Sequence, residues 1–154
     1  MISAAPITAD LFCEVVVQIC ATFDWAPTSF DREGEHVVAV TLSPDDAFSE
    51  VLWILDAAGQ CFRCLVIWRH TLSGTQLTEA LVFSALVNER LYLGCVELHL
   101  QSGNLLFRDG AAITPGTLHD EIGAVTSRVF DLASRYTHVL QKLQAGVSAS
   151  EALS

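Results

Sequence analysis

Apolar residues recur along the chain in two rhythms, one typical of helices and the other typical of strands. Near the start, residues 7–25 carry an apolar residue at every fourth position, which predicts a helix that buries one face. Thr8 stands where a side chain that caps this helix is expected, and Pro27 ends the segment. The apolar stripe of this helix consists of Leu11, Val15, Ile19 and Phe23.

Three strands are expected next, because short runs rich in β-branched residues are separated by turn residues. The first run alternates, so that Val38, Val40 and Leu42 share one face. The second run is apolar on both faces, which is typical of a central strand, and a hairpin at residues 57–60 joins it to the third. The expected strands are residues 36–42, 49–56 and 61–70.

A second helix is expected at residues 77–94, with Gly94 after its last turn. It is apolar nearly all round, so it is either buried or part of a subunit interface. Two strands joined by a turn at residues 102–104 follow it. These strands are residues 95–100, whose Val96, Leu98 and Leu100 are expected to face inward, and residues 105–109.

The closing helix, expected from about Thr117, shows the longest regular pattern in the chain. Its apolar residues alternate at spacings of four and three, which predicts either a helix lying across a sheet or a helix–helix seam. Gly146 is placed to end this helix, and Ser148 with Glu151 predicts one further capped turn. The stripe consists of Leu118, Ile122, Val125, Val129, Leu132, Tyr136, Val139 and Leu143.

Together these elements predict a single α+β domain over residues 1–154. The expected order is α-β-β-β-α-β-β-α. We expect a two-layer sandwich in which a five-stranded, mostly antiparallel sheet carries its helices on one side. A chain of 154 residues is long enough to bury a core without a disulfide or a metal ion.

The amino-acid composition indicates that this domain binds a partner. Hydrophobic residues make up 51% of the chain and charged residues 17%, below the usual share of about 25%. So small a domain cannot bury this much apolar surface, and some of it is expected to face a second copy of the chain. The net charge of −10 disfavours nucleic acid and anionic membranes as partners, and it favours a basic or amphipathic polypeptide segment.

The cysteines and the first residues predict a cytoplasmic protein. Five cysteines without a secretory signal favour reduced thiols. Residues 1–12 lack a basic stretch followed by a long apolar core. The longest apolar run, residues 80–87, is far shorter than the ~20 residues of a membrane span, so no span is expected.

Cys61 and Cys64 have the spacing of a redox or metal motif. Successive side chains on a strand point to opposite faces, so two cysteines three positions apart cannot share a metal ion or a disulfide. A redox motif also needs a helix that starts at the first cysteine, whereas residues 65–68 are strand-like. We therefore interpret both cysteines as structural, with metal or redox function left as the alternative.

No other pattern in the chain predicts catalysis. His119-Asp120-Glu121 is the densest group of potential ligands, but acids in the first turn of a helix are explained by the helix dipole. Residues 31–36 are interpreted as an exposed acidic loop. Neither a nucleophile elbow nor a phosphate-binding glycine loop is present. We predict a protein that is not an enzyme, with no catalytic residue, no metal ion and no cofactor.

The third expected strand carries Arg63 and Arg69 on one face, with Leu65 and Ile67 between them. This face would either lie under a partner subunit or form a groove for a polypeptide with acidic and apolar residues. Free strand edges would add backbone hydrogen bonds to such a ligand. The candidate partner contacts are Trp53, Arg63, Ile67, Arg69, Phe83 and Val87.

A family resemblance rests on scattered residues of the C-terminal half. They are Asn88, Gly94, Gly103, Phe107, Arg108, Tyr136, Gly146 and the Ser-x-x-Glu-Ala-Leu ending that begins at Ser148. Through them, residues 77–153 are similar to the YbjN family of bacterial sensory transduction regulators. The order of elements resembles the type III secretion chaperone-like fold. The resemblance implies a small acidic bacterial protein, not an enzyme and often dimeric, that binds other proteins as a chaperone or regulator.

Two functions from different classes follow from these observations. The first is a chaperone-like or regulatory adaptor, a cytoplasmic homodimer that holds an extended or amphipathic polypeptide segment. The alternative is a sensory regulator that binds a small ligand in a pocket under the closing helix, around Trp68 and Tyr136.

Overall fold

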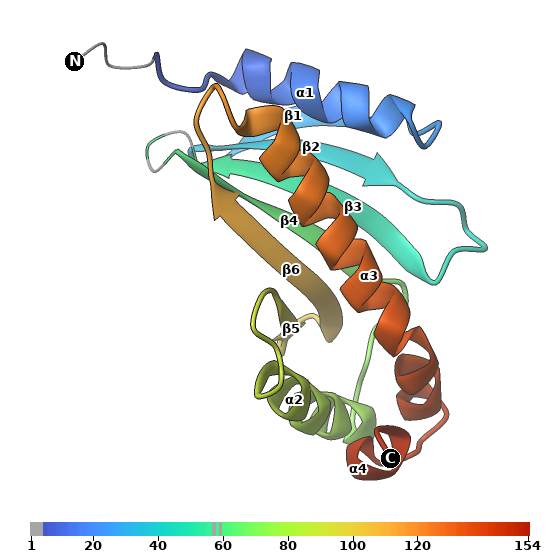
Figure 1. The fold of residues 1–154 in the computed structure, drawn as a ribbon. Coiled ribbons are helices and arrows are strands. Elements are labelled where there is room, and N and C mark those ends of the chain that lie inside the picture. The colour runs from blue at the N-terminus through green and yellow to red at the C-terminus, as the bar shows by residue number, and fades with distance from the viewer. Residues whose placement is uncertain (1–4, 57, 59) are drawn as a thin grey trace.

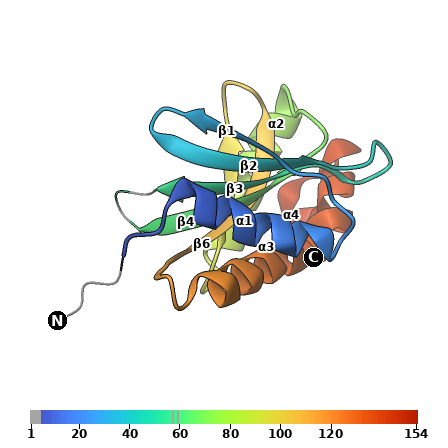
Figure 2. The ribbon, with the colours of Figure 1, turned by 90° about the horizontal axis from the view of Figure 1, so that it is seen from above.

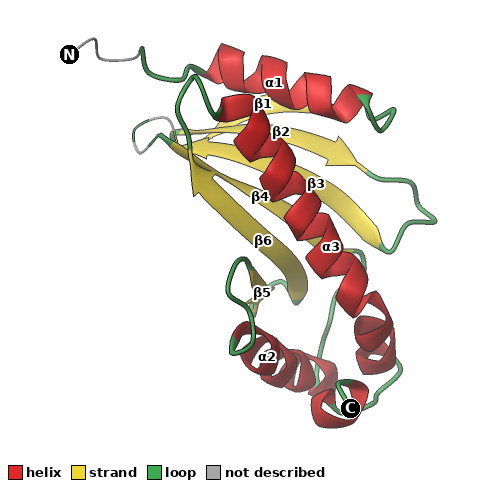
Figure 3. Cartoon of the chain, in the orientation of Figure 1, coloured by secondary structure: helices red, strands yellow, loops and turns green. Residues whose placement is uncertain are grey.

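The computed structural model describes residues 5–56, 58 and 60–154, so the expected hairpin at residues 57–60 lies partly outside the described residues. The described chain forms four helices and six strands (Figures 1 and 3). The helices are α1 (Ala9–Ala21), α2 (Thr75–Asn88), α3 (Leu118–Gln144) and α4 (Ala149–Ala152). The strands are β1 (Thr28–Arg32), β2 (Glu35–Thr41), β3 (Phe48–Asp56), β4 (Cys61–Trp68), β5 (Cys95–His99) and β6 (Asn104–Ala112).

The strands form one sheet in the order β1-β2-β3-β4-β6-β5, and every neighbouring pair is antiparallel. The chain leaves the sheet after β4, forms α2, and returns at the edge with β5 before β6 fills the place beside β4. The predicted α+β class and antiparallel sheet are confirmed. The predicted number of five strands is wrong, because the described chain has six.

The missing strand is β1, part of which was predicted to be an exposed acidic loop at residues 31–36. Its residues are all exposed, so it carries no apolar pattern from which a strand could be predicted. It joins β2 through Glu33 and Gly34, whose φ angles of 51° and 81° are those of a tight two-residue hairpin. His36 Nδ1 lies 2.8 Å from Asp31 Oδ1 across the pair, which ties β1 to β2.

The helices lie on one side of the sheet, with α1 and α3 on the same face (Figures 1 and 2). The long helix α3 crosses β4 and β6, which confirms the first of the two predicted packing modes for the closing helix. Most of its predicted stripe is buried, while Tyr136 and Val139 are partly buried at the margin of the core. Its N-terminal turn carries Asp120 and Glu121, where acids stabilise the positive end of the dipole.

The buried face of α1 is rotated relative to the predicted stripe. Phe12, Val16 and Cys20 are buried beside the expected Val15 and Ile19, whereas the expected Leu11 and Phe23 are exposed. A helix turns once every 3.6 residues, so a strict four-residue spacing drifts around the axis and leaves the core. Phe23 also lies beyond the last residue of the helix. Thr8 caps α1 as predicted, since its Oγ1 accepts a hydrogen bond from the Leu11 N–H.

The helix α2 ends at Asn88, earlier than predicted, and the Asn88 side chain bonds to the backbone of β5. Its Nδ2 donates to the Val96 carbonyl at 2.9 Å and its Oδ1 accepts from the Val96 N–H at 2.8 Å. Gly94, with φ of 73°, belongs to the loop before β5. Leu100 is exposed rather than inward-facing, because β5 ends at His99.

Candidate functional site: the outer face of the sheet

The outer face is the side of the sheet opposite α1 and α3, and no described helix packs on it. Strand register places its side chains in rows across the sheet. One row runs from Val37 through Ile54 and Arg63 to Gly110, and the next includes Leu65 and Arg108. An apolar band therefore crosses the middle of this face. The band consists of Val37, Leu52, Ile54, Leu65, Ile67 and Leu106.

Although no described helix covers it, most of the apolar band is hidden from solvent. Ile54 is only 3% exposed and Leu65 only 7%. Long charged side chains on neighbouring rows can hide apolar atoms in this way, since they lay their aliphatic stems along the surface and keep their charges in water. Arg63 pairs with Ile54 on the neighbouring strand and reaches across β3 to Glu35 on β2, so its side chain extends across this part of the face.

Two ion pairs on this face involve arginines that are partly exposed. Arg63 Nη2 lies 3.0 Å from each carboxylate oxygen of Glu35, and Arg108 Nη2 lies 2.8 Å from Glu97 Oε1. Each of these contacts is made by a single guanidinium nitrogen, Nη2, rather than by the two-nitrogen fork of the strongest arginine pairs. The paired side chains retain between 27% and 40% of their exposure, so each pair contributes only about 0–1 kcal/mol to stability.

Three hollows meet on this face, and Arg63 lines all of them. The largest is a groove of about 390 Å³ that extends from Arg32 on β1 to His99 on β5, with the apolar band as its floor. A second hollow of about 320 Å³ lies around Gly110 and Cys95. A third, of about 110 Å³, lies beside Cys61.

The structure places two of the six predicted contact residues, Arg63 and Ile67, on the outer face as expected. Arg69 has a different role, because its guanidinium is held by backbone carbonyls at the end of the sheet. Its Nε donates to the Asp46 carbonyl at 2.7 Å, and its Nη2 donates to the Ser43 and Phe48 carbonyls at 2.6 and 2.8 Å. Arg69 therefore fastens the loop between β2 and β3 and is not free to bind a partner.

The remaining predicted contacts, Trp53, Phe83 and Val87, lie in the core under the helices and cannot reach a partner. Their prediction as contact residues is corrected for this reason. Trp53 faces α3, where its Nε1 donates to Thr126 Oγ1 at 2.9 Å. The error arose because β3 and α2 are apolar on both faces, so the sequence does not show which face is inward.

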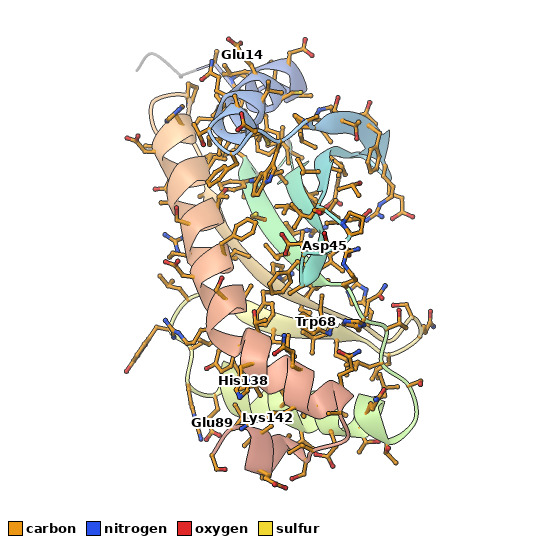
Figure 4. All side chains as sticks on the ribbon, turned by 90° about the vertical axis from the view of Figure 1, so that its right-hand side faces the viewer. Glu14, Asp45, Trp68, Glu89, His138 and Lys142 are labelled. Atoms are coloured by element: carbon orange, nitrogen blue, oxygen red, sulfur yellow. The ribbon has the colours of Figure 1, made fainter. Side chains whose placement is uncertain are left out.

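Trp68 and Tyr136 were predicted to line a ligand pocket; Trp68 lies in the core, and Tyr136 on α3 is partly buried at its margin. The Trp68 ring meets Phe48 edge to face at 5.5 Å, and the Tyr136 ring stacks on Phe107 at 6.4 Å. Trp68 is the last residue of β4, and Figure 4 shows His138 and Lys142 towards the C-terminal end of α3. Trp68 Nε1 has no hydrogen-bond partner among the described residues.

The cysteines lie as the strand geometry predicts, with Cys64 in the core and Cys61 on the outer face. Burial raises the pKa of Cys64 well above its usual range, and it raises the pKa of Cys20 to about 11. Burial therefore disfavours the thiolate form of both residues. Within residues 5–56, 58 and 60–154, no group of three or more His, Cys, Asp or Glu side chains could hold a metal ion.

Several residues of the outer face were absent from the predicted contacts, namely Glu35, Glu97, Arg108 and Gly110. Parity along β6 puts Arg108 and Gly110 on one face, but only the pairing of β6 with β4 brings them beside Arg63.

The described helices are all too short or too polar to cross a membrane. Comparison with family models, with curated proteins and with solved structures finds no match for this chain.

Proposed function

We propose that the protein is a non-enzymatic binding module that holds an extended or amphipathic polypeptide segment against the outer face. The observation that supports this proposal is the apolar band, which lies under partly exposed ion pairs and forms the floor of a groove of about 390 Å³. In this proposal the module is a cytoplasmic adaptor or chaperone related to the YbjN proteins.

The groove suits a segment with both apolar and acidic side chains. Arg32, Arg63 and Arg108 all line it, although the whole chain has only 8 basic residues against 18 acidic ones. Apolar side chains of the segment would gain about 25 cal/mol for each Å² of surface removed from water. The ordering of the segment offsets part of this gain, so a moderate affinity is expected.

The edge strand β1 offers a second kind of contact to the same segment. Its five residues are exposed and it pairs only with β2 among the described strands, so its other edge is open to backbone hydrogen bonds. Phe30 on β1 faces Val37 of the apolar band. A segment added beside β1 could therefore also place a side chain on the band.

A library of short peptides, selected on the immobilised protein, tests this function directly. Ile67→Asp puts a charge at the margin of the band, and it should abolish binding of the selected peptides. Val17→Asp, on the exposed side of α1 in the other layer of the molecule, is the matched control and should leave binding intact. If selected peptides bind both variants as well as the natural protein, the outer face is not the binding surface.

We also propose that the protein is a homodimer, with the second copy covering the exposed side of α2. Leu81 and Val82 on this helix are 51% and 41% exposed, and Tyr92 and Leu93 in the loop after it are more exposed still. Light scattering during size exclusion should give twice the chain mass of 16.7 kDa at low and at high salt. Leu81→Glu should give the single mass, and a natural protein that elutes as a monomer would contradict the proposal.

The alternative function, sensing of a small ligand, is favoured by one observation. The Trp68 indole N–H is a buried donor without a partner among the described residues, and such donors usually meet a ligand or a water molecule. The indole N–H resonance of Trp68 in a nitrogen-15 spectrum tests this. A ligand from a metabolite set that shifts this resonance, and not that of Trp53, would support a sensor.

A further inference from the structure

A position without a side chain interrupts the rows of the outer face. Gly110 lies directly opposite Arg63, and Arg108 precedes it by two residues on the same face of β6. A Cβ atom on Gly110 would lie 2.5 Å from the Phe62 carbonyl oxygen, so no side chain fits there unless β4 moves. The hollow of about 320 Å³ lies at this position, and Gly94 and Cys95 complete its wall.

Carboxylates of the chain itself hold the two arginines beside this hollow in partly exposed ion pairs. Arg63 points away from Gly110 to Glu35, and Arg108 points to Glu97 on the next strand. Diagonal neighbours on antiparallel strands lie within reach of long side chains, so both guanidinium groups can turn towards the empty position above Gly110. Exposed ion pairs of this kind exchange partners at little cost in free energy.

We propose that Arg63 and Arg108 together recognise a carboxylate, an Asp or Glu side chain flanked by apolar residues in the bound segment, above Gly110. In the unbound protein Glu35 and Glu97 bind the two arginines, and they release them when the carboxylate of the segment binds. This inference rests on the proposed binding function and specifies the chemistry that the outer face recognises.

A singly charged carboxylate suits the hollow better than a phosphate group does. Asp109 lines the same hollow, where it accepts hydrogen bonds from Arg128 Nε at 2.7 Å and from the Gly110 N–H at 2.8 Å. Glu35 and Glu97 stay close by after they are displaced. A more highly charged anion would be repelled by Glu35 and Glu97, whereas a carboxylate between apolar side chains also matches the apolar floor.

Cys95 provides a chemical probe inside this hollow. It is half-buried and lines the hollow, and on β5 it pairs with Arg108 of β6. Cys13 on α1 is also half-buried but belongs to the other layer of the molecule, so it serves as an internal control. The rate at which iodoacetamide alkylates each cysteine in the folded protein can be followed by mass spectrometry of the digested chain.

The test compares three probes added to the folded protein: acetyl-Leu-Glu-Leu-amide, acetyl-Leu-Gln-Leu-amide and inorganic phosphate. We expect the glutamate peptide to slow alkylation of Cys95 about two- to tenfold at saturation and to leave Cys13 unaffected. The glutamine peptide and phosphate should protect Cys95 far less. Arg108→Gln or Arg63→Gln should remove the protection by the glutamate peptide.

A second set of variants tests whether the carboxylate of the bound segment replaces Glu35 and Glu97 as the partner of the two arginines. Glu35→Gln and Glu97→Gln should each lower the half-protective concentration of the glutamate peptide about two- to fivefold, because the peptide then displaces a weaker partner. Glu14→Gln, on the exposed side of α1 in the layer opposite the outer face (Figure 4), is the matched control and should change nothing.

The outcomes separate this inference from the function on which it rests. Equal protection by the two peptides would overturn carboxylate recognition and leave the binding function standing. Protection by phosphate as strong as that by the glutamate peptide would overturn it in favour of a small-anion site. If neither peptide protects Cys95 while library peptides still lose binding in Ile67→Asp, only the inference fails. If no peptide binds in either experiment, both fail.

Discussion

The two faces of the sheet bury apolar residues to a similar extent but cover them differently. Leu105 and Leu106 are neighbours on β6, with exposed fractions of 0% and 3%, and they point to opposite faces. Leu105 belongs to the large core under α1 and α3, whereas Leu106 belongs to the small apolar band. Helices cover the first and charged side chains cover the second. Exposure alone therefore does not distinguish a structural core from a binding surface.

The largest expected effect compares these two leucines directly. Leu105→Ala should lower the free energy of unfolding by about 3–5 kcal/mol, because the helices above it cannot collapse into the cavity. Leu106→Ala should cost about 1–2 kcal/mol less, because flexible charged side chains can settle into the space it leaves. Urea unfolding of both variants measures the difference. Equal costs would show that the outer face is as rigidly packed as the inner one.

A buried hydrogen bond on the inner face should give the next largest effect. Thr126→Val preserves the shape of the side chain but leaves the Trp53 indole N–H without its acceptor. An unsatisfied buried donor costs about 1–3 kcal/mol, and urea unfolding should show this loss. Thr137→Val on the same helix, at a partly buried position, is the control and should cost much less. Unchanged stability in Thr126→Val would mean that the contact contributes nothing.

The thiols of the two faces should differ in their effect on stability at alkaline pH. Cys20 and Cys64 have raised pKa values in the folded protein because they are buried, whereas in the unfolded chain they ionise near pH 9. The unfolded state therefore loses protons that the folded state keeps, and stability should fall as the pH rises from about 9 towards 11. The expected loss, summed over the two thiols, is on the order of a few kcal/mol.

Urea unfolding at several alkaline pH values measures this loss. Cys64→Ala should flatten the decline above about pH 9, whereas Cys61→Ala, on the outer face, should leave it unchanged. The same decline in both variants would show that other groups cause it.

The smallest expected effect concerns the ion pairs of the outer face. Glu35→Gln and Glu97→Gln should each change the free energy of unfolding by less than about 1 kcal/mol, because both pairs are partly exposed. Arg128→Gln, which breaks the pair with the buried Asp109 of the inner layer, should cost more. Thermal melting of the three variants ranks them. A large loss of stability in Glu35→Gln would show that the Arg63–Glu35 pair is required for the fold and is not easily exchanged for another partner.

Most elements of the fold could be predicted because their patterns are local. Alternation in residues 36–42 identified the inward face of β2, and the spacing of apolar residues identified α3 almost to its ends. The strand β1 was not predicted, because an edge strand with no buried face has no apolar pattern. The end of α2 was not predicted either, and Asn88 there bonds to Val96, a contact that the local sequence does not indicate.

The candidate site was predicted only in part. Parity along β4 placed Arg63 and Ile67 on one face, and the structure agrees. For Trp53, Phe83 and Val87 the sequence offered no means to tell the inward from the outward side, and the structure puts all three in the core. Arg69 has the same parity as Arg63, but the fold of the loop between β2 and β3 brings three carbonyls within its reach.

The sequence by itself determined the class of fold, the inward faces of the alternating strands and the opposite placement of Cys61 and Cys64. These properties depend on side-chain periodicity, which is set within one element. Only the tertiary structure decided that β6 lies beside β4, which brings Arg108 and Gly110 next to Arg63 and opens a hollow between them. Strand pairing joins residues far apart in the chain, and its register follows from the packing of the whole sheet against the helices.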